Sequence, residues 1–490
     1  MRSYVFLIER GCFSVGWFGV LAKRLPSEIE NMIRIFRHHV SMIVLSLLLL
    51  EALVIFASVH IAMSIFGQSV NNQAANIGAV LFAIVIMLCM TSMGQYQSNN
   101  RDKFEATLVR TGISFFLAAL IVAAGAALAP SVSLSLMTFY AAFVIAFIAV
   151  LATRFFFCSY VAKSKLKRRI LVLGAGDKAK SISNIHRRAD TRGFEIVGFL
   201  CMPGDLSVIQ NSKVIDKSVK LTDLCEELNV DEIVVAVDDR RKSLPVEDIL
   251  QCKMNGVTVI DLLTFFERET GCVRHDMLQP SWMIFSDGFL KGTFRAIIKR
   301  AFDVTVSLLM LAVTWPFMLL TAFAIKIESR FHGPMFYYQK RTGENGKPFN
   351  VIKFRSMRTD AEKDGIARWA KKNDSRITRV GSFIRKTRLD ELPQIFNVLK
   401  GDMSFVGPRP ERPEFVVKLE EKIPYYDERH RVKPGITGWA QVRYPYGSSE
   451  EDSSAKLEYD LYYVKNYSLF LDMLILLQTA EVVIWGKGAR

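Results

Sequence analysis

Long apolar runs dominate the first third of the chain. Four of them lie near residues 40–65, 77–97, 111–129 and 134–157. Each is close to the roughly 20 residues that a helix needs to cross the hydrocarbon of a bilayer. We therefore predict a membrane α-helical bundle of four spans over residues 39–158, behind a cytoplasmic lead-in at residues 1–38.

The loops between these runs predict their orientation. The loops at 66–76 and 130–133 contain no Lys or Arg, whereas Arg101 and Lys103 lie between the second and third runs. Because Lys and Arg concentrate on the cytoplasmic side of a membrane, both ends of the bundle should be cytoplasmic. Glu51 is costly inside the first run, so it is either a functional residue or a polar contact within the bundle.

The pattern changes over residues 165–262 to short apolar strands that alternate with helices. A strand at Ile170–Leu173 runs into the turn Gly174-Ala-Gly176. This alternation predicts an α/β Rossmann-like domain. Gly174 and Gly176 are candidates for cofactor binding, but the acidic residue expected after the second strand is absent. A structural or regulatory role therefore stays open.

A fifth apolar run, Val304–Ile325, follows an aromatic connector at residues 263–295 whose composition suits a lipid interface or packing between domains. Basic residues flank the run on both sides, so both of its ends favour the cytoplasm. Trp315 and Pro316 lie halfway along it, and proline removes a helix hydrogen bond. We predict a re-entrant helical hairpin near residues 300–327 that breaks at this pair, with a kinked ordinary span as the alternative.

Composition and charge narrow the function. Half of the 490 residues are apolar and the formal net charge is +15, with the basic residues beside apolar runs. An anionic membrane surface explains this charge, so membrane lipids are the expected partner and nucleic acid is not. Seven scattered cysteines favour a reducing compartment and argue against a disulfide framework or a zinc site. A homodimer is compatible with these features.

Two adjacent carboxylates, Asp390 and Glu391, lie among basic residues just before Pro393. Proline is tolerated in the first turn of a helix, so a helix should begin near Asp390 and place both acids at its positive end. Such an end also attracts phosphate. Further along, proline on both sides of Arg409 holds the backbone extended and suits a rigid phosphate-binding arginine.

Several motifs in order carry a family resemblance. Together they resemble the bacterial sugar transferase family, the polyprenyl-phosphate phosphoglycosyltransferases, over about residues 295–490. The four-span bundle and Rossmann-like unit ahead of that region are similar to the large polytopic members that initiate exopolysaccharide or O-antigen synthesis. The motifs are Lys353-Phe-Arg355-Ser-Met357, Arg388-Leu-Asp390-Glu391-Leu-Pro-Gln394, Gly401-Asp-Met-Ser-Phe-Val-Gly-Pro-Arg-Pro410 and Lys433-Pro-Gly-Ile-Thr-Gly438.

This resemblance implies a reaction and a place for it. A sugar phosphate would pass from a UDP-sugar to undecaprenyl phosphate, with Mg²⁺ and through a covalent enzyme intermediate. The family also has a re-entrant helix broken near a proline. The catalytic domain, residues 296–490, is therefore expected on the cytoplasmic side of the bacterial inner membrane. The sequence departs from the common family pattern after Gly438, so the sugar is left open.

The resemblance and ordinary acid–base chemistry together suggest roles for the motif residues. Aspartate has a reference pKa of about 4, so Asp390 is an anion at neutral pH and needs no base to act as the nucleophile. Glu391 is assigned to Mg²⁺, which both acids would hold. The candidates for binding phosphate are basic residues of the same motifs: Lys353, Arg355, Arg385, Arg388 and Arg409.

Two other functions compete with this interpretation. A membrane-anchored NAD-dependent nucleotide-sugar dehydratase would need a second glycine-rich fingerprint and a Tyr-x-x-x-Lys pair, whereas Tyr462-Tyr-Val-Lys465 has the wrong spacing. A non-enzymatic scaffold for polysaccharide export would use the acid pair only as a helix cap. Substitution of Asp390 distinguishes the scaffold from the transferase.

Overall fold

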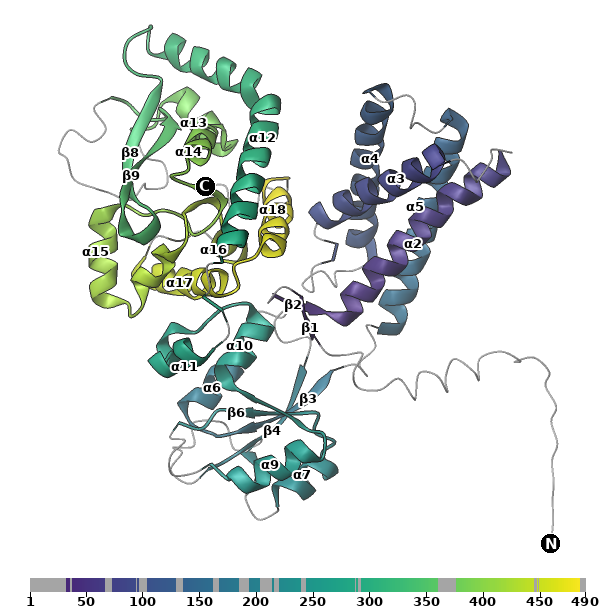
Figure 1. Ribbon diagram of the computed structural model, residues 1–490, viewed down its shortest axis with the longest axis vertical. Coiled ribbons are helices and arrows are strands. Elements are labelled where there is room, and N and C mark those ends of the chain that lie inside the picture. Colours follow the sequence, from purple (N-terminus) through teal and green to yellow (C-terminus); the bar gives the residue numbers. More distant parts are fainter. Residues whose placement is uncertain are drawn as a thin grey trace.

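The computed structural model contains three groups of elements, and the connector helices α10 (Leu262–Thr270) and α11 (Pro280–Phe285) lie between two of them, the α/β sheet and the C-terminal group (Figure 1). Residues 1–31 of the predicted lead-in, and residues 162–166, lie outside the described residues. The described residues are 32–35, 38–66, 73–93, 95–96, 104–128, 135–161, 167–184, 194–202, 214–215, 220–238, 244–286, 288–289, 292–359, 376–444, 447 and 449–484.

The N-terminal group is a helical bundle that follows a short antiparallel pair of strands, β1 (Met32–Ile35) and β2 (His38–Ser41). By length and composition, Leu45–Ile65 and Met137–Phe157 are able to cross a membrane, whereas the apolar stretches Asn76–Ser92 and Thr107–Ala123 are shorter. The helical region is confirmed, and the number of spans stays a prediction. The helices are α2 (Met42–Ile65), α3 (Gln73–Ser92), α4 (Phe104–Leu128) and α5 (Leu136–Val161).

The bundle turns large apolar side chains outward, as expected of a surface that faces lipid. Leu53 and Phe116 are 66% and 65% exposed. Inside the bundle, Glu51 is fully buried, and its carboxylate pairs with the Arg154 guanidinium, with Nε 2.8 Å from Oε1. Tyr96 donates its hydroxyl to the same carboxylate. Glu51 is therefore a polar contact that joins α2 to α5, as one of the two interpretations predicted.

The middle group is a parallel five-stranded sheet with the order β5-β4-β3-β6-β7. Short helices follow its strands, as the alternating pattern predicted, and this confirms the α/β interpretation. The strands are β3 (Arg168–Leu173), β4 (Phe194–Leu200), β5 (Val214–Ile215), β6 (Glu232–Val235) and β7 (Thr258–Asp261). The helices are α6 (Asp177–Ser183), α7 (Leu221–Glu227) and α9 (Val246–Met254).

The connector packs into the core of the C-terminal group. It contains α10 (Leu262–Thr270), the 3-10 turn η4 (His275–Met277) and α11 (Pro280–Phe285). Glu267 of α10 pairs with Lys465 at 2.6 Å, and both side chains are 4% exposed. Lys465 also lies 3.9 Å from the centre of the Trp282 ring, and Trp282 and Phe289 pack against the core of the C-terminal group, so aromatic residues of the connector pack against that group.

The C-terminal group begins with α12 (Thr293–Glu328), a helix of 36 residues that is long and apolar enough to span a membrane. Helix continues through Trp315 and Pro316, so the predicted interruption of the helix at this pair is wrong. Proline inside a helix removes one hydrogen bond and bends the axis without ending the helix. Figure 1 shows α12 changing direction along its length.

The rest of this group folds back against both ends of α12. Lys299 and Asp303 near its start contact Val406 and Ser404, and Glu328 at its end accepts a hydrogen bond from the Val380 backbone. The elements are β8 (Phe336–Thr342), η5 (Glu344–Gly346), β9 (Pro348–Phe354), α13 (Arg379–Lys386), η6 (Leu389–Glu391), α14 (Gln394–Lys400), β10 (Ser404–Val406), α15 (Pro413–Lys422), η7 (Tyr426–Arg431), β11 (Gly435–Thr437), α16 (Trp439–Arg443), α17 (Glu450–Lys465) and α18 (Leu469–Ile484).

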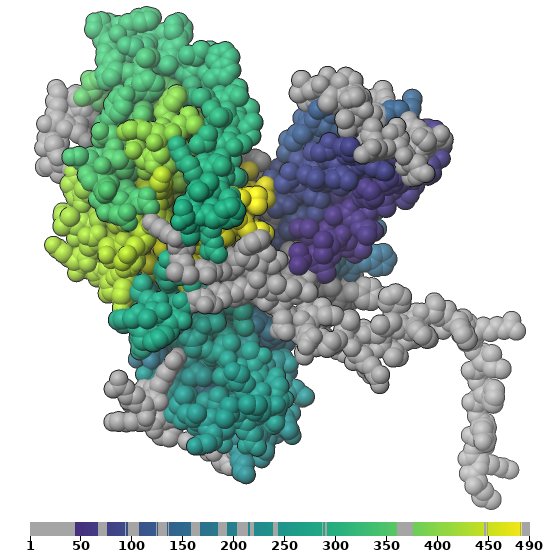
Figure 2. Space-filling view, in the orientation of Figure 1, coloured from purple at the N-terminus to yellow at the C-terminus, as the bar shows by residue number. Residues whose placement is uncertain are grey.

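Helix α18 joins the C-terminal group to the bundle. It contacts α3, β10 and β11. In the space-filling view its yellow surface lies between the green C-terminal group and the blue-purple bundle (Figure 2). Asp472 of α18 pairs with Lys299 of α12 at 2.8 Å, so α18 packs against the N-terminal end of α12.

Candidate functional site

The acid pair lies in the turn η6, between α13 and α14. We predicted a helix that begins near Asp390, but α14 begins at Gln394 and Pro393 is its N-cap residue. Arg388 precedes the turn in the left-handed conformation, with φ 60°. The two acids therefore lie in a 3-10 turn that precedes the regular helix, and the prediction that the α-helix begins near Asp390 is wrong.

Asp390 carries a buried carboxylate. It is 9% exposed, and among the described residues none donates to either of its oxygens. Burial, and then the neighbouring charge of Glu391, raise its pKa to about 6, against the opposing effect of Lys353, Arg385 and Arg388. At neutral pH the group is still mainly an anion, although it ionises well above the reference value used in the sequence argument.

Glu391 is held in the charged form by two cations. Its Oε1 accepts from Lys353 Nζ and from an Arg409 guanidinium nitrogen, both at 2.9 Å. Burial would raise its pKa, but Arg409 and Lys353 outweigh burial and hold the pKa of Glu391 well below its usual range. The two acids therefore differ in chemistry: Glu391 is an ion-paired anion, whereas Asp390 is a buried anion whose oxygens accept no hydrogen bond from the described residues.

The backbone on either side of Arg409 is fixed by two other arginines. Arg429 donates to the Arg409 carbonyl at 2.9 Å, and Arg341 donates to the Pro410 carbonyl at 3.0 Å. Arg429 is itself buried against Asp460, with Nη2 2.7 Å from Oδ2. These bonds hold the Pro-Arg-Pro loop so that the Arg409 side chain reaches Glu391.

The predicted phosphate-binding residues divide into three groups. Lys353 and Arg409 contact Glu391 directly. Arg385 and Arg388 act on the charge of Asp390 through space, so they lie beside it. Arg355 lies apart: its guanidinium packs against Gly333, and in the described part of the chain it neither contacts the acids nor shifts their pKa.

Some of the carboxylate oxygens of the acid pair are suited to bind a divalent cation. Hard cations such as Mg²⁺ prefer carboxylate oxygens. Both Asp390 oxygens are free of hydrogen bonds within the described residues, and so is Glu391 Oε2, whereas Glu391 Oε1 already holds two cationic side chains. A cation at the free oxygens would relieve the repulsion that raises the pKa of Asp390.

The glycine turn of the α/β sheet is filled by a side chain of the same chain. Asp238 accepts from the backbone N–H groups of Asp177 and Lys178, each at 3.1 Å, at the start of α6. A Cβ on Gly176 would overlap with this carboxylate. The carboxylate thus occupies the place where a dinucleotide phosphate lies in a Rossmann turn.

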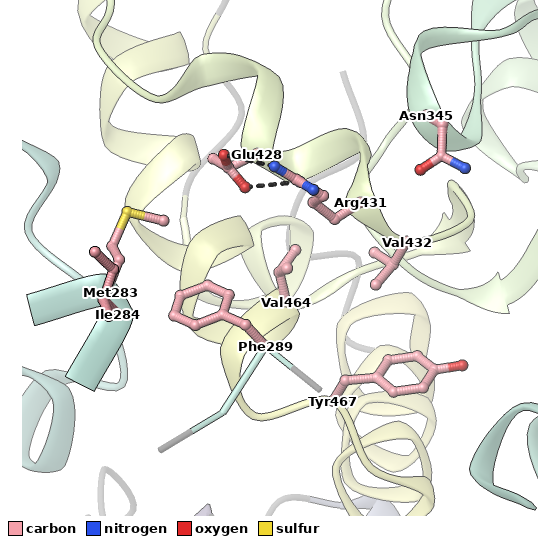
Figure 3. A pocket seen from close by; sticks show the side chains of 9 residues that line it. All are labelled: Met283, Ile284, Phe289, Asn345, Glu428, Arg431, Val432, Val464 and Tyr467. Atoms are coloured by element: carbon pink, nitrogen blue, oxygen red, sulfur yellow. Dashed lines mark hydrogen bonds and ion pairs between the residues drawn. The ribbon is translucent and has the colours of Figure 1, made fainter. Parts of the chain in front are cut away.

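A cavity of about 540 Å³ lies elsewhere, beside the connector (Figure 3). Phe289, Val464 and Tyr467 form one side of it, and the ion pair of Glu428 and Arg431 forms another. None of the residues predicted from the motifs lines this cavity. The acids and their cations therefore define a site distinct from it.

Several residues of the site were missed in the sequence. Arg429, Asp460 and Arg341 fix the Arg409 loop, yet each lies in a segment without a distinctive local pattern. Buried ion pairs between remote segments leave no local signal, because their periodicity matches that of ordinary amphipathic elements. Only the long-range fold brings these residues together.

Comparisons with known proteins give a consistent family. The family model described as bacterial sugar transferase matches residues 294–486, and one described as a CoA-binding domain matches residues 91–254. The chain is 31% identical over 464 residues to a UDP-glucose:undecaprenyl-phosphate glucose-1-phosphate transferase of Klebsiella pneumoniae, covering 90% of this chain and 95% of that protein.

Two other relatives match shorter regions. A transferase with the same description in Xanthomonas campestris pv. campestris is 35% identical, over 66% of this chain and 68% of its own length. A UDP-N-acetylgalactosamine-undecaprenyl-phosphate N-acetylgalactosaminephosphotransferase of Aeromonas hydrophila is 43% identical, over 49% of this chain and 56% of that protein. The names agree on the class of reaction and differ in the sugar.

Proposed function

Because the chain belongs to the bacterial sugar transferase family, among its large polytopic transferases, we propose that it transfers a sugar 1-phosphate from a UDP-sugar to undecaprenyl phosphate. The products are undecaprenyl-diphosphate-sugar and UMP, the first membrane step of exopolysaccharide or O-antigen synthesis. The observation that carries this proposal is the contrast within the acid pair: Asp390 is buried and accepts no hydrogen bond from any described residue, whereas Glu391 is bound to two cations.

The first half-reaction uses Asp390 as the nucleophile. A carboxylate oxygen attacks the sugar-bearing phosphorus and forms an acyl phosphate bond, while the bond to UMP breaks and its electron pair leaves with UMP. A buried carboxylate without hydrogen bonds is a stronger nucleophile than a solvated one, because no hydration shell has to be removed. No proton has to move in this step.

The basic residues stabilise the diphosphate. Arg409 is held rigid by its loop, so little entropy is lost when its guanidinium turns from Glu391 toward phosphate oxygens. Lys353 supplies a second positive charge on the same side of the acids. Mg²⁺ held by Asp390 and by Oε2 of Glu391 would supply charge neutralisation to the diphosphate of the UDP-sugar and to the UMP that leaves it.

The second half-reaction returns the enzyme to its starting state. An oxygen of undecaprenyl phosphate attacks the same phosphorus, the new diphosphate bond forms, and the Asp390 carboxylate leaves. This step requires the acids to lie at the membrane surface, since a 55-carbon lipid stays in the bilayer. The apolar middle of α12 supports this proposed placement, because Val313 and Leu320 are 68% and 66% exposed although both ends of the helix contact the same domain.

We accordingly assign α12 to a bent, re-entrant helix, and α2 to α5 to four spans in the bacterial inner membrane, with the transferase domain on the cytoplasmic side. A straight helix of 36 residues would extend about 54 Å at 1.5 Å per residue, which is much longer than the hydrocarbon is thick. A bend with both ends on one domain is compatible with entry and exit on the same side.

Trapping of the intermediate tests the mechanism. The full-length protein in detergent is incubated with UDP-sugars labelled in the β-phosphate, first UDP-glucose and UDP-N-acetylgalactosamine, without the lipid acceptor. We expect label on the wild-type protein and UMP in solution, and neither with Asp390→Asn. Asp402→Asn, an acid outside the pair, serves as the control and should keep both. UMP release without label on the wild-type protein would contradict the covalent intermediate.

A further inference from the structure

The N-terminal end of α12 carries a buried ion cluster that the proposed chemistry does not use. Lys299 and Asp303 lie one helical turn apart and are 6% and 2% exposed. Lys299 Nζ lies 2.8 Å from Asp472 Oδ2 of α18 and 3.4 Å from Asp303 Oδ1. One lysine thus holds two carboxylates from different helices.

The same cluster holds the short strand β10. Asp303 Oδ1 accepts from the Ser404 hydroxyl and from the Phe405 backbone N–H, both at 3.0 Å. The Val406 carbonyl accepts from Lys299 Nζ at 3.3 Å and from the Tyr463 hydroxyl at 2.9 Å. Every residue of β10 is therefore bonded to a side chain of this cluster or of the helix beside it.

Strand β10 leads directly into the loop that carries Arg409. Gly407 donates its N–H to the Thr437 carbonyl at 2.9 Å, and proline on each side of Arg409 fixes the backbone φ angle. A shift of β10 would therefore be passed to the Arg409 guanidinium, which lies 2.9 Å from Glu391. Arg409 is thus linked through β10 to the contacts at the N-terminal end of α12.

Stability alone does not account for such a cluster. Buried ion pairs often contribute less to stability than apolar residues of the same volume, and their best-attested use is to fix the register of one element against another. Here the elements that the cluster holds in position relative to one another are α12, α18 and β10. We propose that Lys299 and Asp303 are positioning residues that set Arg409 against the acid pair, so that the membrane helix and the phosphate-binding loop form one rigid unit.

This inference rests on the proposed function, and it concerns only how Arg409 is placed. UMP is a suitable probe because it is common to every UDP-sugar. Asp303→Asn removes the charge and keeps the size, and Ser404→Ala removes one donor to Asp303 at small structural cost. Either change should weaken UMP binding and raise the KM for the UDP-sugar about tenfold, the effect of one hydrogen bond to a charged group.

The decisive measurement is a double-substitution cycle with Arg409→Met. If Asp303 acts through Arg409, Asp303→Asn should change UMP affinity less than twofold in the Arg409→Met protein, whereas simple destabilisation would lower affinity equally in both backgrounds. Asp402→Asn, paired with Lys400 outside the cluster, is the matched control and should leave affinity unchanged. Binding is measured by calorimetry on the full-length protein in detergent.

The outcomes separate the two proposals. Wild-type protein that neither binds UMP nor releases it from a UDP-sugar would contradict the proposed function. Wild-type protein that does both, with unchanged affinity in Asp303→Asn and Ser404→Ala, would contradict the positioning role alone. Equal losses with and without Arg409 would also overturn it. If Asp303→Asn does not fold, Ser404→Ala alone decides.

Discussion

The carboxylate of Glu391 lies 2.9 Å from the guanidinium of Arg409, although α14 and β10 separate the two residues in the chain. In the absence of substrate, each neutralises the other. Under the proposed function, a diphosphate that enters the site would compete with Glu391 for Arg409, and it would gain a guanidinium that is already oriented. The pair would therefore keep the proposed phosphate-binding group charged and in place within a buried site.

Substitutions of Arg409 test whether its geometry contributes to binding of the UDP-sugar. Lysine keeps the charge but lacks the planar fork that binds phosphate through two bonds. We expect Arg409→Lys to raise the KM for the UDP-sugar about tenfold, and Arg409→Met to lower kcat/KM at least about a hundredfold. UMP release measures both. Arg431→Met, which removes an arginine paired with Glu428 on η7, is the control, and equal effects at the two positions would contradict a specific role.

Asp390→Asn should stabilise the protein while it abolishes the reaction. The pKa of Asp390 is raised to about 6, so the stability associated with its protonated form is present below about pH 4 and is lost as the pH rises through 6. At pH 7.5 the ionised carboxylate then costs roughly 3 kcal/mol, which the amide avoids.

Thermal unfolding in metal-free detergent solution tests whether Asp390→Asn stabilises the protein. The melting temperature of Asp390→Asn should exceed that of the wild type at pH 7.5, and the difference should shrink as the pH falls toward 4. Asp402→Asn controls for a general effect of removing an acid. A lower melting temperature for Asp390→Asn at pH 7.5 would show that the folded state stabilises the charge.

The secondary structure followed from local patterns, and the candidate site residues came from the motifs that carry the family resemblance. Runs of apolar residues predicted the helices α2 to α5, and the strand–turn–helix alternation predicted the parallel sheet, because each element's period is present within its own residues. The motif residues Asp390, Glu391, Lys353 and Arg409 do converge on one site.

The parts that could not be predicted depend on contacts between distant segments. Arg355 shares a motif with Lys353 but packs against Gly333, since it lies beyond the end of β9. The re-entrant hairpin was expected to break at Trp315 and Pro316, yet α12 continues through the pair because one lost hydrogen bond bends a long helix without stopping it. The Asp238 carboxylate at the glycine turn had no local signal either.

The glycine turn makes a prediction about Gly176 and Asp238. Gly176→Ala should destabilise the protein, because the added methyl group overlaps with the Asp238 carboxylate. Asp238→Ala should cost about 1 kcal/mol through the loss of a cap on α6. In the Asp238→Ala background, Gly176→Ala should be nearly neutral, since the obstacle is gone. Unfolding midpoints of the four proteins measure this coupling, and additive effects would contradict the close contact.

The ion pair in the bundle predicts a second coupling. Arg154→Met leaves Glu51 buried without its cation, which should cost about 3–5 kcal/mol. Replacing both residues, by Glu51→Leu and Arg154→Met, should restore most of that loss, because no uncompensated charge remains. Thermal unfolding in detergent compares the three proteins. A double variant less stable than Arg154→Met would show that the pair contributes more than charge compensation.

The topology of α12 gives the last prediction. Single cysteines at His332 and Asn345, in a protein whose own cysteines are replaced, lie just after α12 and in η5. If α12 is re-entrant, membrane-impermeant reagents added to intact cells should label neither position, and both should react once the inner membrane is opened. A cysteine at residue 70, in the loop between α2 and α3, is the positive control that should react in intact cells. Pro316→Leu should straighten the helix and move His332Cys toward the periplasmic side. Labelling of both positions in intact wild-type cells would establish a true span and place the acid pair outside the cytoplasm.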